Sequence, residues 1–409
     1  MPIPIAGMIA AILISAAPTA AISQSEVLNN QIQLGDVFSG QTLNVVSQSD
    51  SNASAEAVGN SVSGTTSTGD LSFTSSQTMS RATGSETNLN VSQFTGTAEV
   101  TSAATANTGD AQISGGGTLT ATTTQIDNGA SVSANADLSA PNAQVGAATY
   151  DDQAIANSQS FETADSPVQA EASQLNDAGV TTTATAEVGY MPGTGTFLSS
   201  AVGNSVGSAG DGAASQSIGI AQESDAPIVQ AVASTQFGDS EATLTAATAA
   251  SNNVYLTNGS GPLAAAVVQT NSSPVLASST EISDQYGGAT VSAQASANTD
   301  LADNLGPGVA LDNTQSNGVG GVDAEASFSG GSGGVGYDSA VSAEAVGNSV
   351  TGYACSECGG VMAINNSQGN GSAVTANATT TIGSPGRSAI ASSLAVGNAA
   401  SFYVTPPAN

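Results

Sequence analysis

Residues 54–64 read SAEAVGNSVSG, and the phrase returns at residues 342–352 as SAEAVGNSVTG. Midway between the two copies, residues 201–205 read AVGNS. Looser copies of the pattern Ala-x-(Ala/Gly/Ser)-Asn follow one another at intervals of 46 to 50 residues. The asparagines that end the eight copies are Asn60, Asn107, Asn157, Asn204, Asn252, Asn298, Asn348 and Asn398. A repeat of about 48 residues along a chain indicates stacked units that bury one another.

A glutamine keeps step with these asparagines. In six units it follows the asparagine at 17 or 18 residues, and in the seventh at 20. Gln31 precedes Asn60 by 29 residues, where the same register places a glutamine. The later members are Gln77, Gln125, Gln174, Gln222, Gln269, Gln315 and Gln368. Amides at fixed positions predict ladders in which side chain bonds to side chain along the axis, or asparagines that sit at corners in the left-handed conformation.

Between the markers, small apolar and polar residues alternate. Residues 132–136 read VSANA, and residues 291–295 read VSAQA. A period of two predicts strands. Alanine favours helix, but Gly, Ser, Thr and Asn interrupt every window and no apolar stripe of helical period emerges. We therefore expect an all-β fold, a repeat β-solenoid or β-helix of about eight diverged units.

The repeat length also sets limits on the size of one coil. The chain holds too few large side chains for an ordinary globular core, so the interior should be a column of small residues. Two coils per unit, about 16 in all, would give a body about 75 Å long at roughly 4.8 Å per coil. Three short coils per unit are the alternative.

The charge balance restricts the partners. The chain carries 32 acidic residues against two arginines, has no Lys or His, and has a net charge of −30. Binding of nucleic acid is excluded because phosphates need many Lys and Arg. Cationic partners are favoured, and a cationic polysaccharide that carries free amines is one of them. The alternative is that the charge only keeps a β-rich chain soluble.

Catalytic groups are scarce. Without His or Lys, the chain has no imidazole base, no Schiff-base lysine and no phosphate-binding lysine. Chemistry by paired carboxylates needs a cleft flanked by aromatic residues, yet aromatics make up 4% of the chain and Trp is absent. We expect no enzymatic activity, no catalytic residue, no cofactor and no metal site. A carbohydrate-active enzyme built on a β-helix remains the alternative.

The chain divides into an expected signal peptide, residues 1–21, and a repetitive solenoid domain, residues 22–409. An apolar run from Ala6 to Ala17 has the length of a signal h-region, and Ala21 offers a cleavage site. A buried N-terminal strand is the alternative. Cys355 and Cys358 lie in a Gly-rich segment, where we expect a local disulfide, because a redox or zinc motif would need other surroundings.

An export signal before a Lys-poor chain rich in Ala, Ser, Asn and Gly, with recurrent Ala-Val-Gly-Asn-Ser phrases, resembles the holdfast anchor protein D family of stalked bacteria. The resemblance covers most of the mature chain. It implies a cell-adhesion protein at the cell surface, associated with the outer membrane, that tethers the adhesive polysaccharide of the holdfast. It also implies a curlin-like co-subunit and a curli-type secretion pore as partners.

Open sheet edges at the ends of a solenoid also predict self-assembly. The spacing of Gln and Asn is faintly similar to that of curlin repeats, although curlin units are shorter. A self-assembling curli-like fibre subunit is therefore the second hypothesis for the function.

Overall fold

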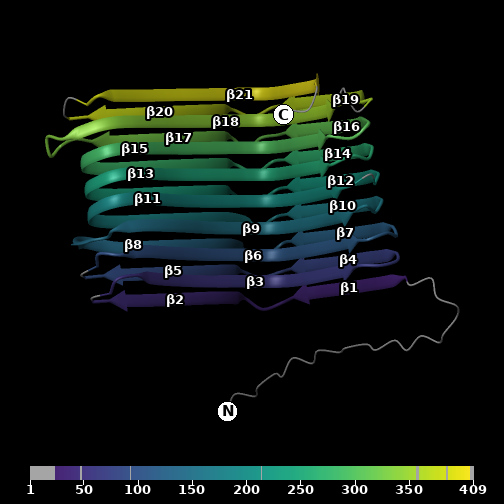
Figure 1. The fold of residues 1–409 in the computed structure, drawn as a ribbon, viewed down its shortest axis with the longest axis horizontal. Helices are drawn as coiled ribbons and strands as arrows, with labels where there is room; N and C mark the ends of the chain where they lie inside the picture. Colours follow the sequence, from purple (N-terminus) through teal and green to yellow (C-terminus); the bar gives the residue numbers. More distant parts are fainter. Residues whose placement is uncertain are drawn as a thin grey trace, which may run out of the picture.

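The structure, a computed structural model, describes residues 24–46, 48–92, 94–212, 214–355, 359–383 and 386–405. Within these ranges every regular element is a β-strand. Each repeat unit forms one coil of three strand segments, and eight coils stack in parallel from β1–β3 to β19–β21 (Figure 1). The predicted all-β repeat solenoid is therefore confirmed. The expected signal peptide and its cleavage site lie outside the described residues.

Two parallel sheets make up the solenoid, and their strand segments form three faces. The first strands of the coils form face A: β1 (Ser25–Gln33), β4 (Leu71–Met79), β7 (Leu119–Asp127), β10 (Val168–Asn176), β12 (Gln216–Ser224), β14 (Leu263–Asn271), β16 (Gly308–Asn317) and β19 (Val361–Asn370). The second strands form face B: β2 (Val37–Val45), β5 (Thr83–Val91), β8 (Ser131–Gln144), β17 (Val322–Gly330) and β20 (Val374–Ile382).

Face C holds the third and longest segments. Its separate strands are β3 (Ser51–Thr66), β6 (Thr97–Ser114), β9 (Ala147–Ala164), β18 (Gly336–Cys355) and β21 (Ser388–Thr405). In the fourth to sixth coils the face-B and face-C segments join in single long strands: β11 (Gly179–Asp211), β13 (Val229–Asn258) and β15 (Val275–Asn304). The coil is therefore continuous in the middle of the stack.

Each coil is flattened into two layers. One half of a face-C strand packs on face B and the other half on face A, so the long strand spans both (Figure 1). Hydrogen bonds across the layers show this division. Ser85 Oγ on β5 donates to Ala55 O on β3 at 2.9 Å, and Gln31 Nε2 on β1 donates to Ser61 O further along β3 at 2.9 Å.

One coil per unit corrects the expectation of two coils. Pairing partners lie a whole unit apart: Ser25 pairs with Leu71, and Asn348 pairs with Asn398. At roughly 4.8 Å per coil the stack is about 38 Å tall, about half of the expected 75 Å. The unequal spacing between the Asn and Gln markers does not reflect several coils per unit. It arises because the Gln and Asn markers lie on opposite layers of the same coil.

Inward side chains alternate with outward ones along each strand, as a period of two requires. Face C breaks this alternation once in each coil: on β6 the consecutive residues Ala106 and Asn107 are both buried. The residue before the marker must be small at this point. A Cβ atom on Gly203 would lie 2.5 Å from Ser251 O of the next coil. Gly59 and Gly347 make the same close approach, which explains why these units have Gly before Asn.

The interior is not made only of small residues. Alanine and valine fill most of the space between faces B and C, as expected. Aromatic side chains stack from coil to coil where the columns allow them: the rings of Tyr150 and Phe197 lie 5.2 Å apart, and those of Phe197 and Phe237 lie 5.6 Å apart. The core therefore runs through the whole stack without a break between domains.

Candidate functional site

The asparagine markers form one continuous ladder inside the solenoid. Each Asn donates through Nδ2 to the Oδ1 of the Asn in the next coil, from Asn60 to Asn398, over 2.7 to 2.9 Å. The same Nδ2 also donates across the layers to a face-A carbonyl oxygen of the next coil, such as Thr78 O for Asn60. The corner alternative does not apply, because Asp165 is the only described non-glycine residue with a positive φ.

The glutamine markers form a second ladder with the opposite polarity. Each Gln donates through Nε2 to the Oε1 of the Gln in the preceding coil, from Gln368 back to Gln31, over 2.7 to 3.0 Å. Each Nε2 also reaches a carbonyl oxygen of face C, as Gln174 reaches Ser205 O at 2.8 Å. Both ladders are buried along most of their length, so these side chains hold the coils together and do not contact a ligand.

A third polar column was missed from the sequence. It lies two residues after the glutamine, and its members are Asp127, Asn176, Asn271, Asn317 and Asn370. Asn271 Nδ2 donates to Asn317 Oδ1 at 2.9 Å, and Asn271 Oδ1 accepts the N–H of Ser273 at 3.1 Å. The column therefore closes the turn between faces A and B. The recurring Gln-x-Asn or Gln-x-Asp was the signal for it.

The predicted disulfide lies at the edge of the described residues. Cys355 ends β18 and is buried. Cys358 lies outside the described residues, so its pairing with Cys355 stays a prediction.

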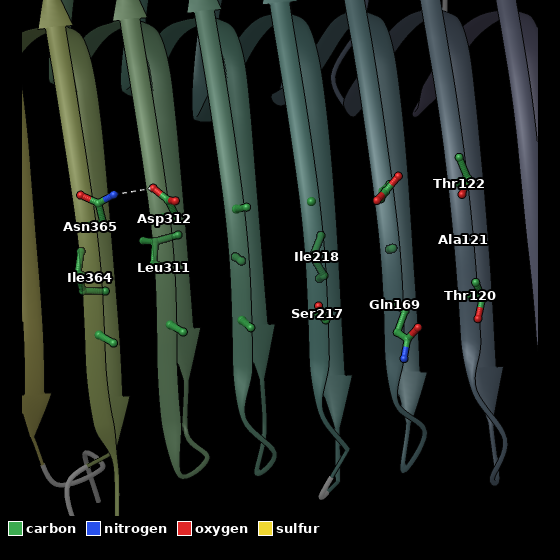
Figure 2. A pocket seen from close by; sticks show the side chains of 18 residues that line it. Thr120, Ala121, Thr122, Gln169, Ser217, Ile218, Leu311, Asp312, Ile364 and Asn365 are labelled. Atoms are coloured by element: carbon green, nitrogen blue, oxygen red, sulfur yellow. Dashed lines mark hydrogen bonds between the residues drawn. The ribbon is translucent and has the colours of Figure 1, made fainter.

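The outer surface of face A carries a groove of about 1000 Å³ across six strands, from β7 to β19. The outward residues that line it lie three and five positions before each glutamine marker. Small side chains form its middle part: Gly219, Ala264, Ala266 and Ala310. Figure 2 shows short side chains on the central strands and longer polar ones toward both ends.

Polar groups flank the small residues of the groove. Glu171 and Gln169 lie on β10, toward one end. At the other end, Asn365 Nδ2 donates to Asp312 Oδ1 at 3.0 Å (Figure 2). Glu171 and Asp312 are exposed, and neither of the two arginines lines the groove. The groove therefore offers a small-residue floor, amide and hydroxyl groups, and negative charge.

The groups with the most perturbed acidity lie inside the solenoid and away from the groove. Burial raises the pKa of Asp300 to about 7 and that of Asp152 to about 8. Burial also raises the pKa of Glu281 to about 7, although hydrogen bonds from Thr243 and Thr245 oppose the shift. Asp152 lies on β9 of the third coil, whereas Glu281 and Asp300 lie on the face-B and face-C segments of β15 in the sixth coil.

Among the described residues, no three acidic or cysteine side chains come together in a way that could hold a metal ion. No helix in that part of the chain could cross a bilayer.

The chain forms an acidic parallel β-solenoid with two internal amide ladders and a groove on the outer surface of face A. A family model described as holdfast attachment protein D matches residues 45–321, about two thirds of the chain. The chain therefore belongs to the holdfast attachment protein D family, whose role is attachment of the holdfast at the cell surface. No curated protein and no solved structure significantly matches the chain.

Proposed function

We propose that this protein anchors the holdfast adhesive to the bacterial cell envelope, and that the groove on face A binds the adhesive polysaccharide. The groove carries the proposal, because it is a continuous hollow that runs along the stack over six coils. Five strand spacings of roughly 4.8 Å give it a length of about 24 Å. That shape suits an extended chain molecule better than a compact ligand.

The groove chemistry supports a sugar polymer with some free amines. Small residues such as Gly219 and Ala266 let a sugar ring approach the backbone closely. Gln169 and Asn365 can bond to hydroxyl groups, and the exposed carboxylates of Glu171 and Asp312 attract ammonium groups. The role is structural and not catalytic, since the carboxyls with raised pKa values are enclosed in the stack.

The site can be tested with isolated holdfast polysaccharide and purified protein. Ala266→Trp fills the middle of the groove, and we expect its affinity to fall by about tenfold or more. Ala103→Trp is the matched control, because Ala103 points outward on face C. Equal binding by wild type and Ala266→Trp would remove the groove from the proposal. An affinity that does not change with ionic strength would contradict an electrostatic contribution to binding.

Export and location are proposed on the basis of the family. We propose secretion through a curli-type pore, together with a curlin-like co-subunit, and retention at the outer membrane. Deletion of the pore should leave the protein inside the cell and the holdfast unattached. Surface labelling of this protein at normal levels in the deletion strain would contradict that route.

The second candidate, a fibre subunit, is favoured by the open sheet edges at the two ends. It concerns the two end coils and not the groove.

A further inference from the structure

The two ends of the solenoid are unpaired sheet edges. In the described part of the chain, β1, β2 and β3 pair only with strands of the second coil. Likewise β19, β20 and β21 pair only with strands of the seventh coil. Both end coils can be seen at the bottom and the top of the stack in Figure 1. An unpaired parallel edge is a template for another strand.

The core is unfinished at the C-terminal end. Val322, Ala324 and Ala326 on β17 are buried, with at most 1% of each residue exposed. Their partners one coil further on, such as Val374 and Ala378, are only partly buried. Phe402 and Val404 point into the core between faces A and C and are 37% and 46% exposed. One more coil on this end would cover these apolar side chains.

The ladders leave complementary groups at opposite ends. Asn398 accepts from Asn348, and its Nδ2 donates to no described residue. At the other end Asn60 donates to Asn107, and its Oδ1 accepts from no described residue. In the glutamine ladder, Gln368 has an unused Oε1, while Gln31 Nε2 lacks the ladder acceptor that every later glutamine has.

We propose that a second copy of this chain stacks head to tail on the first, so that the N-terminal coil of one molecule continues the C-terminal coil of another. The ladder hydrogen bonds then extend across the junction. Asn398 Nδ2 donates to Asn60 Oδ1 of the next molecule, and Gln31 Nε2 of that molecule donates to Gln368 Oε1. The Asn and Gln columns keep the same strand register from the first coil to the eighth. A junction that continues this register therefore forms both hydrogen bonds at once.

Charge favours this orientation over the junction of two N-terminal coils. The N-terminal coil, residues 24–66, carries Glu26, Asp36, Asp50 and Glu56 and no cation. The described residues from 359 onward carry no acid, and their one charged side chain, Arg387, pairs with Asp338 of the preceding coil. Joining two N-terminal coils would bring eight carboxylates together, whereas the head-to-tail junction places an acidic end on an acid-free end.

The decisive variant is Asn398→Asp. Its carboxylate still accepts from Asn348, so the bond within the molecule is kept, but an outward acceptor replaces the outward donor. We expect the protein concentration at half-assembly to rise by about tenfold or more. The matched control is Asn377→Asp, which adds the same charge to the outer surface of the same coil, where Asn377 is exposed. Sedimentation velocity over a concentration series measures both.

Mixing tests the direction of stacking. Asn398→Asp keeps an intact N-terminal coil, so it should add to wild-type ends and stop growth. A small fraction of the variant should therefore shorten wild-type assemblies seen by electron microscopy, while Asn377→Asp should not. Wild-type protein that stays monomeric at every concentration would overturn the proposal. So would a variant that assembles as wild type does, or wild type that assembles only with a different protein.

Discussion

Two kinds of polar side chain are buried in this solenoid, and they differ in whether the repeat satisfies them. Asn204 on the ladder makes three hydrogen bonds, to Asn157, Asn252 and the carbonyl oxygen of Glu223. Asp300 lies inward between Val254 and Val350 of the neighbouring coils, and both of its carboxylate oxygens lack a partner. The ladder asparagine recurs in every coil, whereas the neighbouring coils have Val254 and Val350 at the position of Asp300.

The difference shows what a repeat does for a buried polar group. A buried amide costs free energy unless both its donor and its acceptor are used. Stacking identical coils places the same amide above and below, so every member finds its partners in a fixed register. A carboxyl in a single coil, such as Asp300, finds apolar neighbours, and burial raises its pKa to about 7. The ladders should therefore stabilise the stack, and the single acids should weaken it.

The largest effect should follow from breaking the ladder in the middle. Asn204→Ala removes three hydrogen bonds and leaves buried partners unpaired, at about 1–3 kcal/mol each. We expect the free energy of unfolding in urea to fall by about 3–6 kcal/mol. Ser205→Ala, at the next outward position, should change it by less than about 0.5 kcal/mol. Equal stability of Asn204→Ala and wild type would show that the ladder is not a stabilising element.

The next effect should be a gain, from Asp300→Asn. Burial raises the pKa of Asp300 from 3.8 to about 7 in the folded state. Between these values the unfolded state loses the proton while the folded state keeps it, so stability falls as the pH rises through this window. The full cost above pH 7 is about 4 kcal/mol. Asp300→Asn should be more stable than wild type at pH 8 and should show no advantage near pH 3.

Urea unfolding at several pH values measures this slope. Glu171→Gln is the control, because Glu171 is exposed and its substitution should leave the slope unchanged. If wild type and Asp300→Asn lost stability in parallel between pH 4 and 7, the buried acid would not be the source.

A smaller effect is expected at the end of the ladder. Asn398→Ala removes one acceptor, which lies 2.7 Å from Asn348 Nδ2. Asn398 is exposed, so water can replace the lost bond. We expect a loss of about 0.5–1.5 kcal/mol in monomeric protein. If Asn398→Ala lowered the free energy of unfolding as much as Asn204→Ala, the contribution of a ladder asparagine would not depend on its position along the stack.

The smallest effect on folding should come from the groove. Glu171→Gln and Asp312→Asn together should change the unfolding free energy by less than about 0.5 kcal/mol, since both side chains are exposed. The same pair should weaken binding to holdfast polysaccharide and remove its salt dependence. Binding that keeps its dependence on salt would assign the charge effect to other acids.

The ladder positions were predictable because they recur. Asn204 and Gln222 can be identified in the sequence only because equivalent residues recur at the same position in the other units. The strands pair these equivalent residues with one another. The coil count was not predictable in the same way. In the sequence, two markers within one unit can lie on opposite layers of one coil or on two successive coils. The pairing of Asn204 with Asn252, one whole unit apart, shows that each unit forms one coil.

The groove depends on residues that do not recur. Gly219 and Ala266 occupy the same outward position in two coils, where other coils have Thr122 or Glu171. No motif marks them. Once the glutamines are known to point inward, an offset of three residues identifies the outward positions, but the hollow itself results from how small neighbours line up across strands.

The most direct test of the account is a distance along the stack. Thr74 and Asn365 occupy the same outward column on β4 and β19, six coils apart. Thr74→Cys and Asn365→Cys can carry spin labels in a chain whose native cysteines are replaced by serine. One coil per unit predicts a separation of about 29 Å between the two sites by electron double resonance. A separation near 58 Å would mean two coils per unit and would contradict the structure described here.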